Sequence, residues 1–178
     1  MPVTVPPSAN NVASKRFRQK PFGPPSDGLS RMDTHQTLRL LVVEDDPAYQ
    51  YLIKMAFSTH GEQTRWALTV VTNGQEALDI LFDEEKECAP LPDLILLDWN
   101  LPIVSGNDVL RRVKRDHKLR KIPILVFSSS DADSDILAAY DDHANGYITK
   151  PHGFEALQTI VEAIERFCAT VQLPKVVR

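Results

Sequence analysis

Five short apolar runs alternate along the chain with stretches in which apolar residues recur every three or four positions. The runs cover residues 38–43, 66–71, 93–97, 122–127 and 146–149. A spacing of three or four residues places side chains on one face of a helix, so the intervening stretches predict amphipathic helices. The residues with this spacing are Tyr49, Leu52, Ile53 and Ala56; Ala77, Leu78 and Leu81; Val109, Leu110 and Val113; and Phe154, Leu157, Ile160, Val161, Ile164 and Cys168.

Strands that alternate with helices predict an α/β fold built on a parallel sheet. The runs are continuously apolar, as expected of central strands that helices cover on both faces. The pattern therefore predicts a doubly wound, five-stranded parallel sheet with helices on both faces. In such sheets, ligands bind beyond the carboxyl ends of the strands.

Composition divides the chain of 178 residues into three parts. Residues 1–37 hold six of the 13 prolines and show no apolar periodicity, so we expect a disordered, dispensable leader. Residues 38–169 are long enough to form one domain with its own core, and residues 170–178 form a short tail. Met32 stands just before the predicted domain and is a possible natural start.

Charge and cysteine content exclude several classes of protein. Residues 1–37 carry five Lys or Arg against two Asp or Glu, whereas the remainder carries 15 against 22. With a net charge of −4, the whole chain does not resemble a nucleic-acid-binding protein. Cys88 and Cys168 are far apart in the sequence and predict reduced thiols. No stretch resembles a membrane span or a secretory signal, so we expect a cytoplasmic protein.

The predicted strands end in residues that can carry chemistry. Glu44 and Asp45 follow the first run, Asp98 the third, Ser128 the fourth and Lys150 the fifth. Because parallel strands end at one edge of the sheet, these side chains are expected to meet there. Clustered carboxylates repel one another unless a cation or a lysine compensates them.

Further residues after the strands are predicted to be ordinary caps. Asp46 precedes Pro47, and Ser129, Ser130, Asp131 and Asp133 stand ahead of the helix that follows the fourth strand. Asp and Ser at such positions usually accept hydrogen bonds from the first backbone N–H groups of a helix.

Four segments in this order resemble the receiver domain of two-component response regulators. They are VVEDD (42–46), LILLDWNLP (94–102), ILVFSS (124–129) and GYITKP (146–151). The resemblance covers residues 38–169 and implies a flavodoxin-like fold. A closer likeness is to stand-alone regulators that partner bacterial phytochrome-type histidine kinases.

The resemblance implies a phosphorylation site with a bound metal ion. Asp98 would accept the phosphoryl group from a phosphohistidine. Asp45, Asp98 and the backbone carbonyl of Asn100 would ligate Mg²⁺, and Glu44 would assist through water. Mg²⁺ prefers carboxylate and carbonyl oxygens and retains some waters, which suits an open acidic site.

The resemblance also implies a switch around that site. Lys150 would contact the phosphoryl oxygens, and a cis peptide before Pro151 would direct it there. Ser128 would donate its hydroxyl to the phosphoryl group, and the ring of Tyr147 would then turn inward. Trp99, next to the acceptor, is expected to be partly exposed.

The implied protein is a phosphoacceptor that takes part in its own phosphorylation and dephosphorylation, rather than a conventional enzyme. Its partners would be a sensor histidine kinase and a second copy. That copy would bind to the surface formed by strand 146–149 and the helices before and after it. Residues 170–178 are too few for a DNA-binding domain. The alternatives are a phosphorelay intermediate or a haloacid-dehalogenase-type phosphatase, which would need an aspartate where this chain has Asn100.

Overall fold

The computed structural model describes residues 37–59, 65–83 and 90–176. All of the described residues belong to one unit, Thr34–Arg178. The predicted leader, apart from Thr37, lies outside the described residues. The elements in chain order are β1 (Thr37–Val43), α1 (Pro47–Thr59), β2 (Arg65–Val71), α2 (Gly74–Phe82), β3 (Leu94–Leu97), α3 (Gly106–Arg115), the 3-10 turn η2 (Leu119–Lys121), β4 (Ile124–Ser128), α4 (Asp133–Asp141), β5 (Gly146–Thr149) and α5 (Phe154–Thr170).

The five strands form one sheet in the order β2-β1-β3-β4-β5, and every neighbouring pair is parallel. This arrangement confirms the predicted doubly wound fold and is the strand order of flavodoxin-like proteins. The register pairs Val43 with Leu97 and Leu97 with Val126. The first, third and fourth strands therefore deliver their next residues to the same edge of the sheet.

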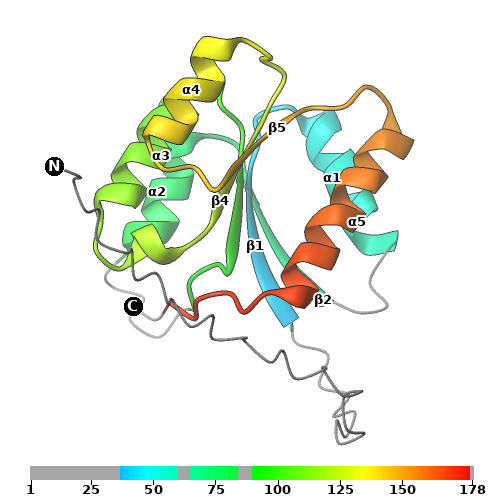
Figure 1. Ribbon diagram of the computed structural model, residues 1–178, viewed down its shortest axis with the longest axis horizontal. Coiled ribbons are helices and arrows are strands. Elements are labelled where there is room, and N and C mark those ends of the chain that lie inside the picture. Colours follow the sequence, from blue (N-terminus) through cyan, green and yellow to red (C-terminus); the bar gives the residue numbers. More distant parts are fainter. Residues whose placement is uncertain (1–36, 60–64, 84–89, 177–178) are drawn as a thin grey trace, which may run out of the picture. The chain divides into compact units, whose positions relative to one another are not determined.

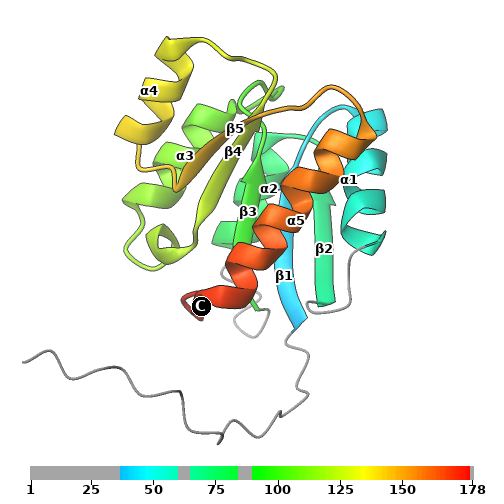
Figure 2. The ribbon, with the colours of Figure 1, turned by 45° about the vertical axis from the view of Figure 1, so that its right-hand side comes forward.

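Helices cover both faces of the sheet, as Figures 1 and 2 show: α1 and α5 lie on one face, and α2, α3 and α4 on the other. Alternate residues of β1 supply the two cores. Leu40 and Val42 belong to the cluster that contains the buried residues of α1 and α5. Leu41 and Val43 belong to the cluster beneath α2 and α3. Burial on both faces is why the strands are continuously apolar.

The start of α3 lies directly against the end of β3. The backbone N–H of Gly106 donates to the carbonyl of Trp99 at 3.0 Å. A Cβ atom on Gly106 would lie 2.0 Å from the carbonyl oxygen of Asp98 and 2.8 Å from the Cα of Trp99. Only glycine permits this approach, so Gly106 brings the helix close to the residue that follows β3.

The described tail after α5 contributes to the core, which the sequence did not indicate. Leu173 packs against the cluster on the α1 and α5 side. Val176 is buried within the cluster on the opposite side. Among the described residues, no helix is both long enough and apolar enough to cross a membrane.

Candidate functional site

The turn after β1 presents one buried and two exposed carboxylates. Glu44 is only 1% exposed, whereas Asp45 and Asp46 are exposed. The carboxylate of Asp46 accepts the backbone N–H of Ala48 at 2.8 Å, which confirms its predicted role as a cap. The side-chain amide of Gln50 donates to the backbone carbonyl of Glu44 at 2.6 Å. These bonds fix the turn and leave Glu44 and Asp45 available for the site.

Asp98 follows β3 and is 5% exposed. Its backbone N–H donates to the carbonyl of Val43 at 2.9 Å, which extends the pairing of β3 with β1. Its carboxylate accepts the backbone N–H of Asn100 at 3.2 Å. The chain thus turns immediately after Asp98 and leaves this carboxylate at the sheet edge.

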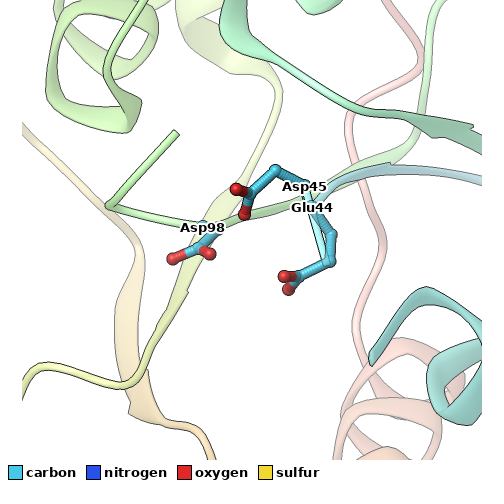
Figure 3. A group of neighbouring side chains, drawn as sticks. All are labelled: Glu44, Asp45 and Asp98. Carbon is cyan, nitrogen blue, oxygen red and sulfur yellow. The ribbon is translucent and has the colours of Figure 1, made fainter. Parts of the chain in front are cut away.

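Three carboxylates meet at this edge. One oxygen from each of Glu44, Asp45 and Asp98 lies within 4.8 Å of the others. Figure 3 shows that Glu44 and Asp45, though adjacent in the chain, direct their carboxylates differently, with that of Asp45 turned toward Asp98. Lys150 Nζ lies 2.6 Å from Glu44 Oε2 and 2.8 Å from Asp98 Oδ2. The sequence prediction that these four side chains converge is therefore confirmed.

The residues present fit a hard divalent cation. Three carboxylates and one ammonium group meet here, so the formal charge of the site is −2. Hard oxygen ligands within a few ångströms of one another are what Mg²⁺ or Mn²⁺ prefers. The exposure of Asp45 leaves an open side, from which such an ion could retain water ligands.

Burial acts on the pKa values of Glu44 and Lys150 in opposite directions. Burial raises the pKa of Glu44 above its ordinary value, and the hydrogen bond and charge of Lys150 only partly oppose this effect. Burial alone would lower the pKa of Lys150, but its hydrogen bonds to Asp98 and Glu44 outweigh burial and raise it. Lys150 therefore remains a cation at neutral pH, and it is the counter-charge of the buried acids.

The end of β4 holds Lys150 in place. The backbone N–H of Lys150 donates to the carbonyl of Ser128 at 2.7 Å. The implied cis peptide before Pro151 is not found, because every peptide bond in the described part of the chain is trans. Lys150 reaches both carboxylates with this trans geometry, so the expectation is wrong for this structure.

Trp99 points into the core rather than toward solvent. It is 7% exposed and belongs to the cluster beneath α2 and α3. Its ring lies edge-on to that of Tyr147, with centroids 6.4 Å apart. The expectation that Trp99 is partly exposed is therefore wrong, because its ring packs within this cluster and against Tyr147.

Ser128 and Tyr147 are connected through Ser130. Ser128 is fully buried, and its hydroxyl oxygen accepts the backbone N–H of Ser130 at 3.1 Å. The hydroxyl of Tyr147 donates to the backbone carbonyl of Ser130 at 2.9 Å. The Ser130 hydroxyl in turn donates to Asp135, in the first turn of α4. These bonds form a continuous path from the end of β4 to β5 and α4.

The prediction that α4 is capped by one of Ser129, Ser130, Asp131 and Asp133 is wrong. The N-cap of α4 is Ala132, which makes no side-chain cap.

Sequence reasoning also missed Tyr49, whose ring lies 4.8 Å from Lys150 Nζ. Its only signal was helical spacing, and this spacing marks it as a core residue of α1.

Comparisons with known proteins agree with this geometry. A sequence model described as the response regulator receiver domain matches residues 40–162. The chain is 40% identical over 128 residues to a probable methanogenesis regulatory protein, FilR2, of Methanothrix harundinacea, covering 72% of this chain and 81% of FilR2. It is 36% identical over 137 residues to response regulator Rcp1 of Synechocystis, covering 76% and 92% of the two chains.

Solved structures give the same likeness. The Mn²⁺-bound form of Rcp1 superposes with a TM-score of 0.70 at 35% identity and covers 77% of this chain and 99% of that one. The phosphorylated cyanobacterial phytochrome response regulator RcpA superposes with a TM-score of 0.71 at 38% identity, with coverages of 78% and 99%. Nothing in these comparisons favours a relay intermediate or a haloacid-dehalogenase-type phosphatase.

Proposed function

Because the chain belongs to the response regulator receiver domain family, we propose that it takes a phosphoryl group onto Asp98 and signals through its own surface. The observation that carries this proposal is the position of Asp98 at the end of β3. There its carboxylate lies within reach of two further carboxylates and of Lys150. A carboxylate attacks phosphorus well only where positive charge offsets the charge on the phosphoryl oxygens.

The chain's own groups perform distinct parts of the reaction. One Asp98 oxygen forms the bond to phosphorus as the bond from phosphorus to the donor's histidine nitrogen breaks and the imidazole leaves. The other Asp98 oxygen stays near the Asn100 N–H. One N–H of the Lys150 ammonium donates to the Asp98 carboxylate at 2.8 Å in the unphosphorylated chain. During the reaction this N–H donates to a phosphoryl oxygen instead. The Ser128 hydroxyl oxygen accepts the backbone N–H of Ser130, and its own proton can be donated to the phosphoryl group. In this sense the protein takes part in its own phosphorylation and dephosphorylation.

Mg²⁺ is the proposed cofactor. Glu44, Asp45, Asp98 and the backbone carbonyl of Asn100 would hold it, with Glu44 acting through water. When bound, the ion neutralises charge on the transferring phosphoryl group. Support comes from the three clustered carboxylates and from Rcp1, which has been solved in a Mn²⁺-bound form.

The proposed phosphodonor is a sensor histidine kinase of the phytochrome type. Support comes from the family and from RcpA, which is described as a phytochrome response regulator.

The cytoplasmic location expected from the sequence stays a prediction.

The proposed output surface is formed by α4, β5 and α5. Exposed apolar side chains lie on both helices, among them Leu137 and Tyr140 on α4 and Phe167 on α5. An apolar groove of about 690 Å³ lies on the α5 side of the sheet, where residues of β3, β4, β5, α5 and the tail line it, Phe167 among them. A second copy is the proposed partner on this surface, because twofold pairing of identical surfaces is the commonest form of protein association. Tyr147 of β5 connects this surface to Ser130 and the site.

Chemical mapping of the phosphoryl group tests the proposal. The full chain is incubated with Mg²⁺ and acetyl phosphate, and the product is reduced with borohydride, which cleaves an acyl phosphate and marks its aspartate. Peptide mass spectrometry should find the mark at Asp98. A mark at Asp45 or Asp46, or no mark at Asp98, would refute the assignment.

Replacing Ser128 with alanine should separate phosphorylation from output. The variant keeps Asp98 and Lys150 but loses the hydroxyl that links the phosphoryl group to Ser130 and Tyr147. We expect the parent to shift from monomer toward dimer on phosphorylation, and the variant to accept phosphate with less than about half of that shift. Light scattering with and without acetyl phosphate measures the monomer–dimer shift, and retained radiolabel measures the uptake of phosphate. Ser129→Ala, one residue beyond the strand, is the matched control, and a full shift in Ser128→Ala would contradict the switch.

A further inference from the structure

Tyr49 lies beneath the lysine of the site. The Lys150 ammonium is 4.8 Å from the centroid of the Tyr49 ring. The Tyr49 hydroxyl lies 3.5 Å from the backbone carbonyl of Pro151, the residue after this lysine. The same aromatic residue therefore contacts both the charged end of Lys150 and the chain that leads away from it.

The position of Tyr49 is well defined. Tyr49 stands in the first turn of α1, which starts at Pro47. Asp46 caps this turn, and Gln50 ties it to the carbonyl of Glu44. The ring also packs against that of Phe127 of β4, with centroids 5.7 Å apart. The ring is thus held by contacts with the sheet as well as by its place in α1.

The ring remains neutral and is suited to a cation. Burial, with the nearby charges of Glu44 and Asp98, raises the pKa of Tyr49 to about 12. The face of a neutral aromatic ring attracts an ammonium group, and the attraction strengthens where water is excluded. The Lys150 side chain is 11% exposed, so water is largely excluded here.

The donors of Lys150 show why this contact matters. An ammonium group has three donors. One faces Glu44 and one faces Asp98, at 2.6 and 2.8 Å. A carboxylate or carbonyl below the lysine would compete for a further donor, whereas the ring attracts the whole charge without a directed hydrogen bond.

We propose that Tyr49 is a positioning residue that holds the Lys150 ammonium at the phosphorylation site while its contact partner changes from the Asp98 carboxylate to the phosphoryl group. This inference rests on the proposed function and adds a residue to it. When Asp98 carries the phosphoryl group, the Lys150 N–H that faced Asp98 donates to a phosphoryl oxygen instead. The ring and Glu44 keep the other sides of the ammonium in place during that exchange.

The contact itself is tested without phosphorylation. An aromatic ring beneath Lys150 shifts the proton resonance of its ε-methylene upfield, and Lys150→Arg identifies that resonance by removing it. We expect the upfield shift in the parent and in Tyr49→Phe, and its loss in Tyr49→Leu. An unchanged shift in Tyr49→Leu would overturn the contact.

The effect on the reaction is tested with acetyl phosphate and Mg²⁺ on the full chain. Tyr49→Leu should lower the second-order rate constant for phosphorylation about tenfold, the scale of a shielded cation–π contact. Tyr49→Phe, which retains the ring, should stay within about twofold of the parent. Phe57→Leu is the matched control, because it removes another aromatic ring from the same apolar cluster.

The control separates positioning from packing. Phe57→Leu should lower the melting temperature and leave the rate constant unchanged. An equal loss of rate in Phe57→Leu, or a parental rate in Tyr49→Leu, would overturn the role of Tyr49. A parent that takes no phosphate on Asp98 would refute the proposed function, and the role of Tyr49 with it, even where the resonance shift upholds the contact.

Discussion

Replacing Asp98 with asparagine will reduce phosphoryl uptake from acetyl phosphate to background while the chain stays folded. The amide oxygen can still accept the Asn100 N–H, so the local turn is retained. The amide cannot form an acyl phosphate, and it offers Lys150 and a divalent cation no negative charge. Radiolabel retained on the full chain measures uptake, and circular dichroism checks the fold.

A neighbouring carboxylate provides the control for this substitution. Asp46 is exposed and caps α1 through the N–H of Ala48. Asp46→Asn keeps a capping oxygen and should take up label as the parent does. If Asp98→Asn is labelled as strongly as the parent, another residue is the acceptor.

Replacing Gly106 with alanine should lower the free energy of unfolding by about 3 kcal/mol, the upper range for inserting a methyl group into a packed site. The added Cβ would lie 2.0 Å from the backbone oxygen of Asp98. Backbone cannot rotate away as a flexible side chain can, so α3 must move off the end of β3. Urea denaturation of the parent and the variant measures the difference.

Gly153→Ala separates crowding from backbone strain. Gly153 has a φ of 94°, but a Cβ there would meet nothing within 4 Å. Alanine at this φ should cost about 1 kcal/mol through strain alone. A loss for Gly106→Ala no larger than that for Gly153→Ala would show that α3 does not pack closely on the turn after Asp98.

The sequence alone was sufficient to determine the sheet and its functional edge. The five apolar runs correspond to strands β1 to β5. They could be predicted because the alternation of side chains along a strand follows from local backbone geometry. Parallel strands all end at one edge, so Glu44, Asp45, Asp98 and Lys150 were expected to meet there without any knowledge of distances. The four segments that resemble receiver domains identified the family for the same reason: each begins within a strand and extends to that edge.

Only the tertiary structure decided which groups touch there. Lys150 is 52 residues from Asp98 in the sequence, and Pro151 is 102 residues from Tyr49. Local sequence pattern carries no information about contacts at such separations. Three features depend on how the helices and the tail pack on the sheet: the ring of Tyr49 near that ammonium, the burial of Trp99 and the burial of Val176. Periodicity states which face of an element is buried, whereas the partner on that face is set by register, helix position and rotamer, which arise only when distant segments pack together.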